Sequence, residues 1–449
     1  MQLHVGLDDT DSTKSGCTTY ITSCLIEVLH KKGYTNFLDY PNLIRLNPNI
    51  PWKTRGNGAT CLRLNLKAKD DCRDVEDVVL DFIEKNFERD SETNPGIAFL
   101  EGDVPIVLKN FSSEALWRVV DVDEALRIAG NIKCKVYWFN DVKGVVGALA
   151  AIGETLDGDH TYEVLTYRKI ENRGKPRRID LNSVWKMDKV TKPLTYNNID
   201  YETGRILITP RGRDPVLYGI RGESFNIVKY AMRLIKVYEP IERWTIFRSN
   251  QGTDAHLRKI CKICETKPYS SLILEGYVSS QPSMTIGGHI IFKLKDETGE
   301  IYCAAYEPTG NFRNIIKNLI VGDRIRVYGG LRKAPPITPK TVNLEKIEIL
   351  NLAKKVEEKN PQCPICSKRM TSMGLNKGFK CEKCGYRDPK AKKILIEVER
   401  NIKPTLYIPP PRAQRHLTKP YERYGQEKTF TFKVYKKIQP KNFWGLGDS

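Results

Sequence analysis

Residues 3–19 read LHVGLDDTDSTKSGCTT, in which a short apolar strand runs directly into a cluster of carboxylates and hydroxyls. Leu3, Val5 and Leu7 alternate as strand residues do. Three acids within four residues repel one another unless a cation neutralises them, and clustered hard oxygen ligands suit Mg²⁺. We therefore predict that this loop holds magnesium and a phosphate group through the carboxylates of Asp8, Asp9 and Asp11.

A helix is predicted to start just after this loop, because apolar residues recur at helical spacing from Ile21 to Leu29. Free amides at a helix N-terminus bind anions. The residue directly before Lys14 is not glycine, so the sequence does not match the Walker pattern. We therefore predict an unrelated nucleotide site. The alternative is a solvated acidic loop that caps the helix through Ser15. The candidate nucleotide-binding residues in this stretch are Gly6, Thr10, Ser12, Lys14 and Gly16.

Composition indicates a globular, multidomain chain with a polyanionic partner. The 449 residues carry 73 Lys and Arg against 54 Asp and Glu, a formal charge of +19 that favours nucleic acid, although a heat-adapted, lysine-rich proteome gives the same excess. There is no signal-like pattern, and the longest uncharged stretches, such as 144–153, are too short to span a bilayer. We expect a cytoplasmic protein without a membrane partner, and nothing indicates an obligate protein partner.

Two C-x-x-C pairs lie fourteen residues apart, at Cys363, Cys366, Cys381 and Cys384. Four thiolates on two knuckles bind one Zn²⁺ tetrahedrally and leave no position open for chemistry. This spacing predicts a structural zinc ribbon. Cys261 and Cys264, with His256 upstream, lack a fourth ligand, so buried or incidental thiols are favoured over a second metal.

Five strand-like runs upstream of the ribbon predict an OB fold. They cover 272–278, 289–295, 301–306, 325–328 and 342–349, with a helix at 312–319 between the third and fourth strands. Aromatic and basic side chains on such a barrel serve single-stranded nucleic acid, whereas a purely structural barrel is the alternative. The candidate RNA-binding residues are Phe292, Tyr302, Tyr306, Arg324 and Arg326.

Other segments suggest further parts of a substrate site. The loop 46–60 is rich in Asn, Pro and Gly, and Arg45, Lys53 and Arg55 on or beside it are candidates to bind phosphates, unless the loop is only a mobile surface segment. Residues 144–153 predict a helix packed closely on a sheet, and 160–168 predict a strand. Residues 392–449 hold thirteen Lys or Arg against five Asp or Glu, with many aromatics, which fits RNA binding better than a disordered tail.

Residues 211–223 mix acids, arginines and a tyrosine. Either they form an ion-pair network or they line an acid-aromatic recess for a cationic ligand. The candidate residues of such a recess are Asp214, Tyr218 and Glu223.

The order of these parts resembles the archaeal isoleucine-tRNA 2-agmatinylcytidine synthetases along essentially the whole chain. The motifs that carry the resemblance are GLDDTDS at 6–12, GCTT at 16–19, RLNPNIPWKTRGNG at 45–58, GALAAIG at 147–153, DHTYE at 159–163 and SNQGTDAHL at 249–257. One departure is FNDVK at 139–143, where relatives tend to carry a glycine-rich stretch.

The resemblance implies a multidomain α/β and α+β protein with a kinase-like catalytic unit, a ferredoxin-like unit, an OB-fold β-barrel and a zinc ribbon. We place their limits at 1–135, 136–265, 266–352 and 353–390, followed by a basic aromatic extension at 391–449.

The resemblance also implies a ligase that uses ATP to attach agmatine to C2 of the wobble cytidine of an isoleucine tRNA, through a phosphorylated cytidine. Asp8, Asp9 and Asp11 would then hold Mg²⁺ with ATP, and Thr18 matches the threonine that the family autophosphorylates. Agmatine is doubly cationic and would use the recess at 211–223. The competing hypotheses are a non-catalytic single-strand-binding protein and a small-molecule kinase or ligase regulated by RNA.

Overall fold

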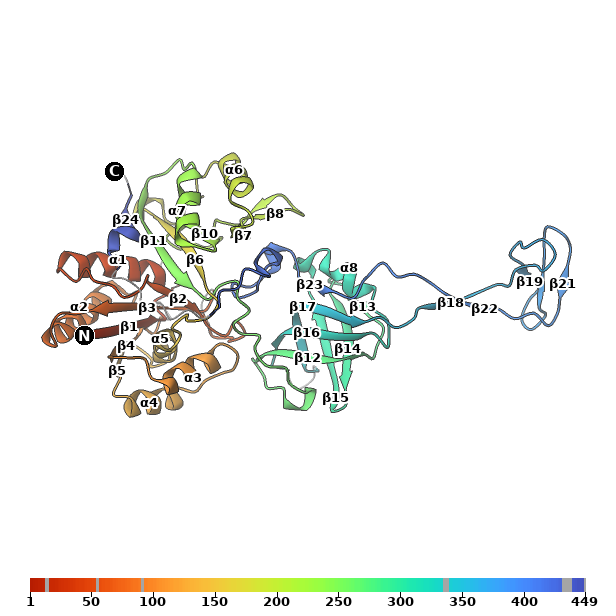
Figure 1. Ribbon diagram of the computed structural model, residues 1–449, viewed down its shortest axis with the longest axis horizontal. Coiled ribbons are helices and arrows are strands. Elements are labelled where there is room, and N and C mark those ends of the chain that lie inside the picture. The colour runs from red at the N-terminus through yellow and green to blue at the C-terminus, as the bar shows by residue number, and fades with distance from the viewer. Residues whose placement is uncertain (13–15, 54–55, 90–92, 334–338, 430–437, 448–449) are drawn as a thin grey trace.

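The chain folds into a two-part α/β body, a β-barrel beside it and a small cysteine-rich unit at the end of a long stalk (Figure 1). The computed structural model describes residues 1–12, 16–53, 56–89, 93–333, 339–429 and 438–447. Within these ranges, no helix combines the length and the apolar character that a membrane-spanning segment needs. The architecture confirms the predicted multidomain α/β and α+β class.

The N-terminal unit is a sheet with helices on both faces. Its elements are β1 (Gln2–Asp8), α1 (Thr18–Lys31), β2 (Asn42–Arg45), β3 (Gly58–Asn65), α2 (Asp70–Asn86), β4 (Gly96–Glu101), α3 (Ile106–Ala115), α4 (Val122–Asn131), β5 (Lys135–Trp138) and α5 (Gly144–Gly153). The strands lie in the order β5-β4-β1-β3-β2. Leu3, Val5 and Leu7 of β1 are fully buried under α1 and α2, while α3, α4 and α5 cover the other face.

Helix α5 lies directly on the strands, as the small residues of 144–153 predicted. A Cβ added to Gly6 would come within 2.1 Å of the Ala148 carbonyl oxygen, and one added to Gly96 would come within 2.0 Å of the Gly144 carbonyl carbon. Such distances allow only glycine. Gly6 therefore serves helix packing inside the sheet, which corrects its prediction as a nucleotide-binding residue.

A buried polar pair fastens the C-terminal end of α5 to the sheet. Arg63 Nη2 donates to the carbonyl oxygens of Ile152 at 3.1 Å and Glu154 at 2.9 Å, where a helix end needs donors. Arg63 Nη1 donates to His4 Nδ1 at 3.1 Å, and His4 Nε2 donates to the Gly102 carbonyl at 2.9 Å. His4 is therefore a neutral imidazole with its proton on Nε2.

The second unit has the βαββαβ order of a ferredoxin-like fold. Its elements are β6 (Thr161–Arg168), α6 (Leu181–Thr191), β7 (Thr195–Tyr196), β10 (Val216–Gly222), α7 (Phe225–Leu234) and β11 (Ile241–Ser249), with a hairpin of β8 (Ile199–Asp200) and β9 (Arg205–Ile206) inserted after β7. The strands lie in the order β11-β6-β10-β7. The predicted strand at 160–168 is confirmed as β6.

The two units share a single sheet, because β11 pairs in parallel with β2. Arg248 is opposite Asn42 and Ser249 is opposite Leu43, which gives the order β5-β4-β1-β3-β2-β11-β6-β10-β7. One hydrophobic cluster includes Leu25 of α1, Met187 of α6 and Val228 of α7, so the helices of both units pack over the same face. The edge between the units is thus a continuous structure rather than a hinge of loops.

Packing suggests that the first unit ends later in the sequence than residue 135, the limit predicted from the resemblance. β5 pairs with β4, and α5 lies on β1 and β4. We propose to place the limit after Gly153, so that both elements stay with the sheet that they cover.

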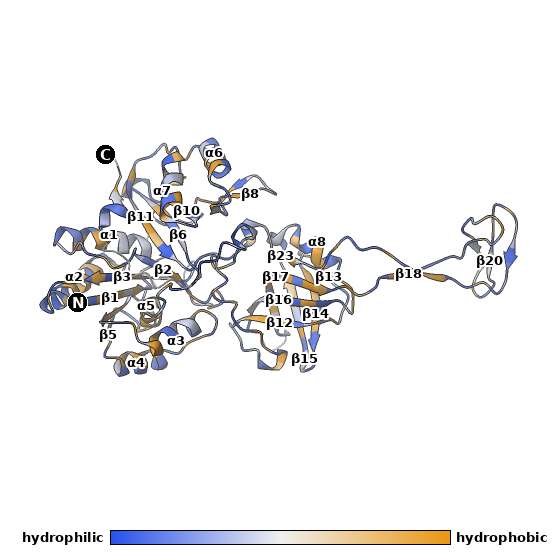
Figure 2. Ribbon diagram, viewed as in Figure 1, coloured by the Kyte–Doolittle hydropathy of each residue, from blue (hydrophilic) through white to orange (hydrophobic). Residues whose placement is uncertain are grey.

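A closed barrel follows, with β12 (Ser271–Val278), β13 (Ser283–Met284), β14 (Ile290–Asp296), β15 (Gly299–Ala305), α8 (Phe312–Lys317), β16 (Arg324–Leu331) and β17 (Thr341–Asn351). The order is β12-β16-β17-β15-β14-β13, and β12 also pairs with β14. Figure 2 shows hydrophobic residues along these strands, which enclose the barrel core. The predicted OB fold, with its helix between the third and fourth strands, is confirmed.

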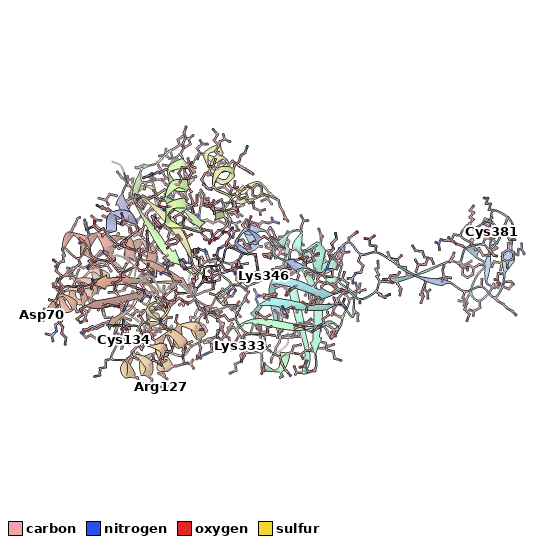
Figure 3. All side chains as sticks on the ribbon, viewed as in Figure 1. Asp70, Arg127, Cys134, Lys333, Lys346 and Cys381 are labelled. Atoms are coloured by element: carbon pink, nitrogen blue, oxygen red, sulfur yellow. The ribbon has the colours of Figure 1, made fainter. Side chains whose placement is uncertain are left out.

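The cysteine-rich unit stands away from the body on a stalk of β18 (Val356–Lys359) paired with β22 (Ile394–Glu397). It contains β19 (Thr371–Ser372), β20 (Phe379–Lys380) and β21 (Arg387–Asp388). Figure 3 labels Cys381 within this unit.

The chain then returns to the body as a tail, which we define as residues 403–429 and 438–447. β23 (Leu406–Tyr407) pairs with β17, and β24 (Trp444–Leu446) pairs with β11. Lys346 lies at the junction of barrel and body (Figure 3), where its buried Nζ donates to the hydroxyl of Tyr424 at 3.0 Å. The tail is therefore packed structure.

Buried His4 should make the stability of the fold depend on pH. Burial, with the charge of Arg63, lowers the pKa of His4 from 6.5 to about 3. Between these values the unfolded chain binds a proton that the folded chain excludes, so the free energy of unfolding falls as the pH drops from about 6.5 toward 3. We expect His4→Gln to make this decline shallower by up to about 1.4 kcal/mol per pH unit, measured by denaturant unfolding between pH 7 and 4. The exposed His30→Gln is the control. Equal slopes for the parent and His4→Gln would contradict the prediction.

Candidate functional site

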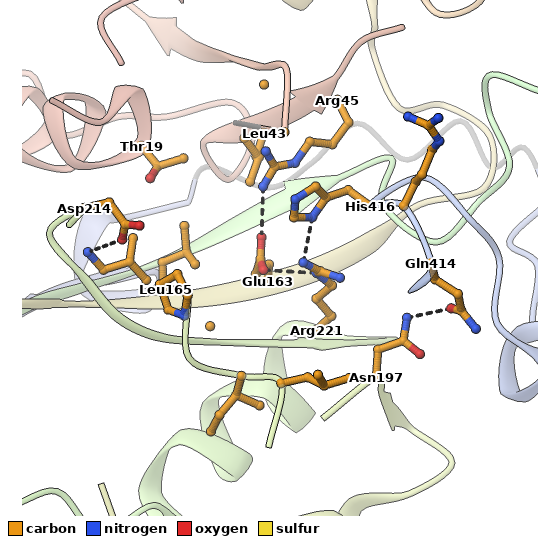
Figure 4. A pocket seen from close by; sticks show the side chains of 18 of the residues that line it. Thr19, Leu43, Arg45, Glu163, Leu165, Asn197, Asp214, Arg221, Gln414 and His416 are labelled. Atoms are coloured by element: carbon orange, nitrogen blue, oxygen red, sulfur yellow. Dashed lines mark hydrogen bonds and ion pairs between the residues drawn. The ribbon is translucent and has the colours of Figure 1, made fainter. Parts of the chain in front are cut away.

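A cavity of about 660 Å³ lies where three parts of the chain meet (Figure 4). The N-terminal unit, the second unit and the tail all contribute to its wall. Among the residues that line it are Asp11, Thr18, Arg45, Lys53, Glu163, Asp214, Arg221, Arg412, Arg415 and His416. Seven Lys or Arg and three Asp or Glu of the described chain line the cavity, which is an excess of positive charge suited to phosphate groups.

The acidic loop reaches this cavity at the start of α1. Asp11 Oδ1 accepts hydrogen bonds from the backbone N–H of Thr18 and from its Oγ1, the latter at 3.0 Å. Thr10 Oγ1 donates to Thr18 Oγ1 at 3.1 Å. Thr18 is thus the first residue of α1, with its hydroxyl held by Asp11 and with the helix N-terminus beside it. The predicted strand-to-helix turn is confirmed.

Asp8 and Asp9 lie behind Asp11, at the end of β1, and neither lines the cavity. Burial raises the pKa of Asp8 well above its usual range, and the charge of Asp9 raises it further. Burial also raises the pKa of Asp9 to about 6, although Asn94 Nδ2 donates to Asp9 Oδ2 at 3.2 Å. A cation beside these carboxylates would favour their charged forms, so the pair fits a divalent ion by charge and by donor type.

The hydroxyls and the glycine of the loop hold its shape. Ser12 Oγ accepts from the backbone N–H of Gly16 at 2.8 Å and donates to Glu88. A Cβ on Gly16 would approach the Thr10 carbonyl oxygen to 2.6 Å, so the turn requires glycine. Thr10 and Ser12 are buried. Lys14, the remaining predicted residue of this stretch, lies outside the described residues, as does the alternative helix cap at position 15.

Three basic residues were predicted on or beside the loop 46–60. Arg45 and Lys53 line the cavity, and Arg55 lies outside the described residues. Arg45 Nε donates to Gln251 Oε1 at 3.3 Å, and its Nη2 lies 3.9 Å from Glu163 Oε2. Burial lowers the pKa of Arg45 while Glu163 raises it.

The structure does not bring the predicted recess at 211–223 together. Asp214 lines the cavity, where its Oδ1 accepts from Arg177 at 3.2 Å. Tyr218 is 1% exposed, and its hydroxyl donates to the Met232 carbonyl inside the core. Glu223 pairs with the tail through Arg423 at 2.6 Å and Lys428 at 2.9 Å. Core packing and ion pairing therefore correct the assignment of Tyr218 and Glu223 to a common recess.

The barrel residues also divide into core and surface. Phe292 is 1% exposed, because every second side chain of β14 points into the barrel and Phe292 alternates in step with the buried Ile290 and Leu294. This burial corrects its prediction as an RNA-stacking residue. Tyr302 and Tyr306 are partly exposed, with Lys293 over the first ring at 5.3 Å and Arg332 over the second at 5.4 Å. Arg324 and Arg326 share Glu275 at 2.5 and 3.0 Å.

The four cysteines of the ribbon form a compact metal-ligand set. Their sulfur atoms all lie within 4.8 Å of one another, with Cys363 to Cys384 and Cys366 to Cys381 both at 3.4 Å. Backbone N–H groups lower the pKa of Cys381 to about 6, which favours the thiolate. Four thiolates at this spacing fit a tetrahedral Zn²⁺ site with bonds of about 2.3 Å.

The second cysteine pair forms no such set within the described chain. His256, which precedes it, is fully buried and binds Glu345 Oε2 at 2.8 Å. Cys261 contacts the barrel backbone at Ile273.

Sequence reasoning assigned no role to Glu163 and His416, which lie beside Arg221 in the cavity (Figure 4). Glu163 on β6 accepts from Arg221 on β10, and His416 of the tail accepts from the same arginine. The signal for Glu163 was an acidic residue inside a strand of mainly aromatic and β-branched residues whose side chains are buried. His416 had no local signal, because only the return of the tail brings it to the body.

Four family models match successive parts of the chain. They are described as the TiaS TCKD domain (4–141), the TiaS FLD domain (143–256), an OB-fold nucleic acid binding domain (272–350) and the TiaS C-terminal zinc ribbon domain (360–402).

Curated relatives and solved structures agree with these matches. The isoleucine-tRNA 2-agmatinylcytidine synthetases TiaS of Pyrococcus horikoshii and Methanosarcina mazei are each 43% identical, over 94% and 93% of this chain and 97% of each relative. The apo TiaS crystal structure is 39% identical with a TM-score of 0.85, over 94% of this chain and 98% of that one. A crystal structure of TiaS in complex with an isoleucine tRNA, AMPCPP and agmatine is 36% identical with a TM-score of 0.81, over 98% of this chain and 100% of that one.

Serine at both Cys381 and Cys384 should remove one bound zinc ion per chain, because it takes away two of four ligands. Metal analysis of the purified protein measures this loss. Cys264→Ser removes an exposed thiol outside the cluster and should retain the zinc. An unchanged zinc content in the double variant would refute the site.

Proposed function

The chain belongs to the TiaS family of isoleucine-tRNA 2-agmatinylcytidine synthetases, and we propose that it attaches agmatine to a cytidine of an isoleucine tRNA with the use of ATP. It is an enzyme that acts on tRNA, and it carries a zinc ribbon. The observation that carries the proposal is the single cavity that joins Asp11 and Thr18 to Asp214 and to a cationic wall.

The chemistry requires the C2 oxygen of the cytidine to be activated before it can leave. In the proposed sequence a phosphoryl group of ATP passes to that oxygen, the primary amine of agmatine bonds to C2, and the C–O bond breaks with release of phosphate and of the amine protons. Net formation of a carbon–nitrogen bond with consumption of ATP would make the enzyme a ligase. Positioning and electrostatic stabilisation supply most of the catalysis in phosphoryl transfers.

We assign the nucleotide end of the cavity to the acidic loop. Asp8, Asp9 and Asp11 would hold Mg²⁺, which neutralises charge on ATP when bound. Burial raises the pKa values of Asp8 and Asp9, and a bound cation would favour their charged forms. Thr10, Ser12 and Gly16 shape the loop, and Arg45 and Lys53, which line the same cavity as Asp11, would bind phosphates.

Thr18 is the proposed acceptor of a phosphoryl group on the protein itself. Its Oγ1–H points to Asp11 Oδ1 at 3.0 Å, so the carboxylate is placed to take the hydroxyl proton. The free N–H groups at the start of α1 would then favour the phosphate.

Asp214 remains the proposed contact for the guanidinium of agmatine, because of the three predicted residues of the recess it alone lines the cavity. Tyr302, Tyr306, Arg324 and Arg326 remain proposed RNA contacts on the barrel. Their partial exposure and their aromatic and basic character support that role.

Asp9→Ala and Thr18→Ala should abolish ATP consumption that depends on agmatine and tRNA. The first change removes a proposed metal ligand, and the second removes the phosphoryl acceptor. Mass spectrometry of isoleucine tRNA after incubation with ATP and agmatine measures the product. Asp81→Ala, which changes an exposed acid on α2, should keep full activity. Product formation by both site variants would contradict the assignment of Asp9 and Thr18 to the catalytic site.

The same assay separates the competing functions. A non-catalytic single-strand binder would consume no ATP, and a small-molecule kinase or ligase would consume it without tRNA.

Asp214→Asn should raise KM for agmatine by at least ten-fold, because it removes the negative charge opposite the guanidinium. The affinity for ATP should stay within two-fold of the parent. Steady-state rates at varied agmatine concentration measure it. Tyr218→Phe, which alters only a core hydroxyl, is the matched control and should leave KM unchanged. An agmatine KM equal to that of the parent in Asp214→Asn would remove Asp214 from the pocket.

A further inference from the structure

The tail contributes a wall of the cavity, from Pro411 to Leu417, although it lies more than 150 residues beyond the second unit's strands in the sequence. Buried charges anchor it. Arg423 is fully buried and donates to Asp159 at 2.8 Å, Glu223 at 2.6 Å and the Gly252 carbonyl at 2.6 Å. On the barrel side, Arg415 Nε lies 2.9 Å from Glu345. These bonds fix the position of His416 between them.

His416 is a neutral hydrogen-bond acceptor in this position. Its Nδ1 lies 2.7 Å from Arg221 Nη2. A guanidinium carries only donors, so the lone pair is on Nδ1 and the imidazole proton is on Nε2. Burial, with the charges of Arg45, Arg221 and Lys53, lowers the pKa of His416 well below its usual range. The ring therefore orients Arg221 without adding or cancelling charge.

The cluster around Arg221 keeps an excess positive charge. Arg221 and Glu163 are cross-strand neighbours on β10 and β6, and Arg221 Nε donates to Glu163 Oε1 at 3.1 Å. The other oxygen of Glu163 accepts from Gln251 at 2.6 Å and lies 3.9 Å from Arg45. One carboxylate thus serves two guanidiniums. Arg221 lines the cavity, and no hydrogen bond of its Nη1 is found among the described residues.

This geometry distinguishes Arg221 from an arginine that only fastens two strands. The cross-strand pair with Glu163 would do that without the tail. A neutral acceptor at Nη2 instead leaves the charge in place and fixes the plane of the guanidinium fork, and Arg221 itself lines the cavity. A planar fork of this kind matches the oxygen atoms of a phosphate.

We propose that Arg221 is a phosphate-binding residue of this cavity and that His416 of the tail is its positioning residue. The inference rests on the proposed function, which supplies two sources of phosphate: ATP and the backbone of the tRNA beside the target cytidine. The tail is thereby a working part of the catalytic cavity.

Equilibrium binding of ATP and of isoleucine tRNA, measured separately on the full-length protein, tests the role of Arg221. Arg221→Met should weaken one of the two by at least ten-fold and leave the other within two-fold, which identifies the source of the phosphate. If the phosphate belongs to the tRNA, the slope of log Kd for tRNA against the logarithm of the salt concentration should fall by about 1 in Arg221→Met. Arg213→Met, an exposed arginine outside the cavity, should change neither affinity.

A double-mutant cycle tests the role of His416. His416→Leu should weaken the same ligand as Arg221→Met, whereas His416→Asn, whose amide oxygen replaces Nδ1 as the acceptor, should bind within two-fold of the parent. The double variant Arg221→Met with His416→Leu should bind no weaker than Arg221→Met alone. The affinity of Arg221→Lys, which keeps the charge but loses the planar fork, should lie between that of the parent and that of Arg221→Met.

Unchanged affinity for both ligands in Arg221→Met would overturn the proposal, and so would multiplicative effects in the double variant. Thermal melting verifies that each variant is folded. Binding needs no turnover, so absence of the modified nucleotide with the parent protein would refute the proposed function alone, independently of these results.

Discussion

The parallel pairing of β2 with β11 is the contact on which the rest of the structure depends. Only Asn42 and Leu43 take part in it through the backbone ladder, opposite Arg248 and Ser249. Side chains lengthen it: Asn250 binds both the N–H of Arg45 at 2.8 Å and its carbonyl at 2.9 Å. The buried Arg248 adds an ion pair to Asp39 at 2.8 Å. Two units of different topology thereby become one sheet, and Arg45 is fixed where they meet.

This joint brings groups of opposite charge close together. The acidic loop follows β1, where burial makes Asp8 and Asp9 reluctant to ionise without a cation. Arg45 and Arg221 line the cavity that the loop reaches through Asp11, and they share Glu163. In the proposed function, a nucleotide triphosphate with a divalent ion would complement both groups, with the ion at the carboxylates and the phosphates at the arginines.

The tail returns to complete the cavity because its polar side chains find buried partners in the second unit and in the barrel. Arg412 pairs with Asp200 at 2.6 Å, Lys346 of the barrel binds Tyr424, and Arg423 spans Asp159 and Glu223. A lost partner would leave a buried charge uncompensated, which costs more than an exposed ion pair yields. Barrel, body and tail are therefore held in a fixed relation, while the ribbon extends away from them on its stalk (Figure 1).

Local sequence determined the elements of this protein and the chemistry of its conspicuous clusters. Period-two alternation located β1 and the barrel strands, small residues located α5, and cysteine spacing located the metal site, because each of these signals is contained within a few neighbouring residues. Tertiary structure decided which side chains share a cavity. Phe292 and Tyr218 were aromatic in the right segments but faced the core, and Glu223 was acidic but already paired with Arg423. His416 joined Arg221 only because buried ion pairs draw the tail back across 195 residues of chain, and no local pattern encodes a contact of that span.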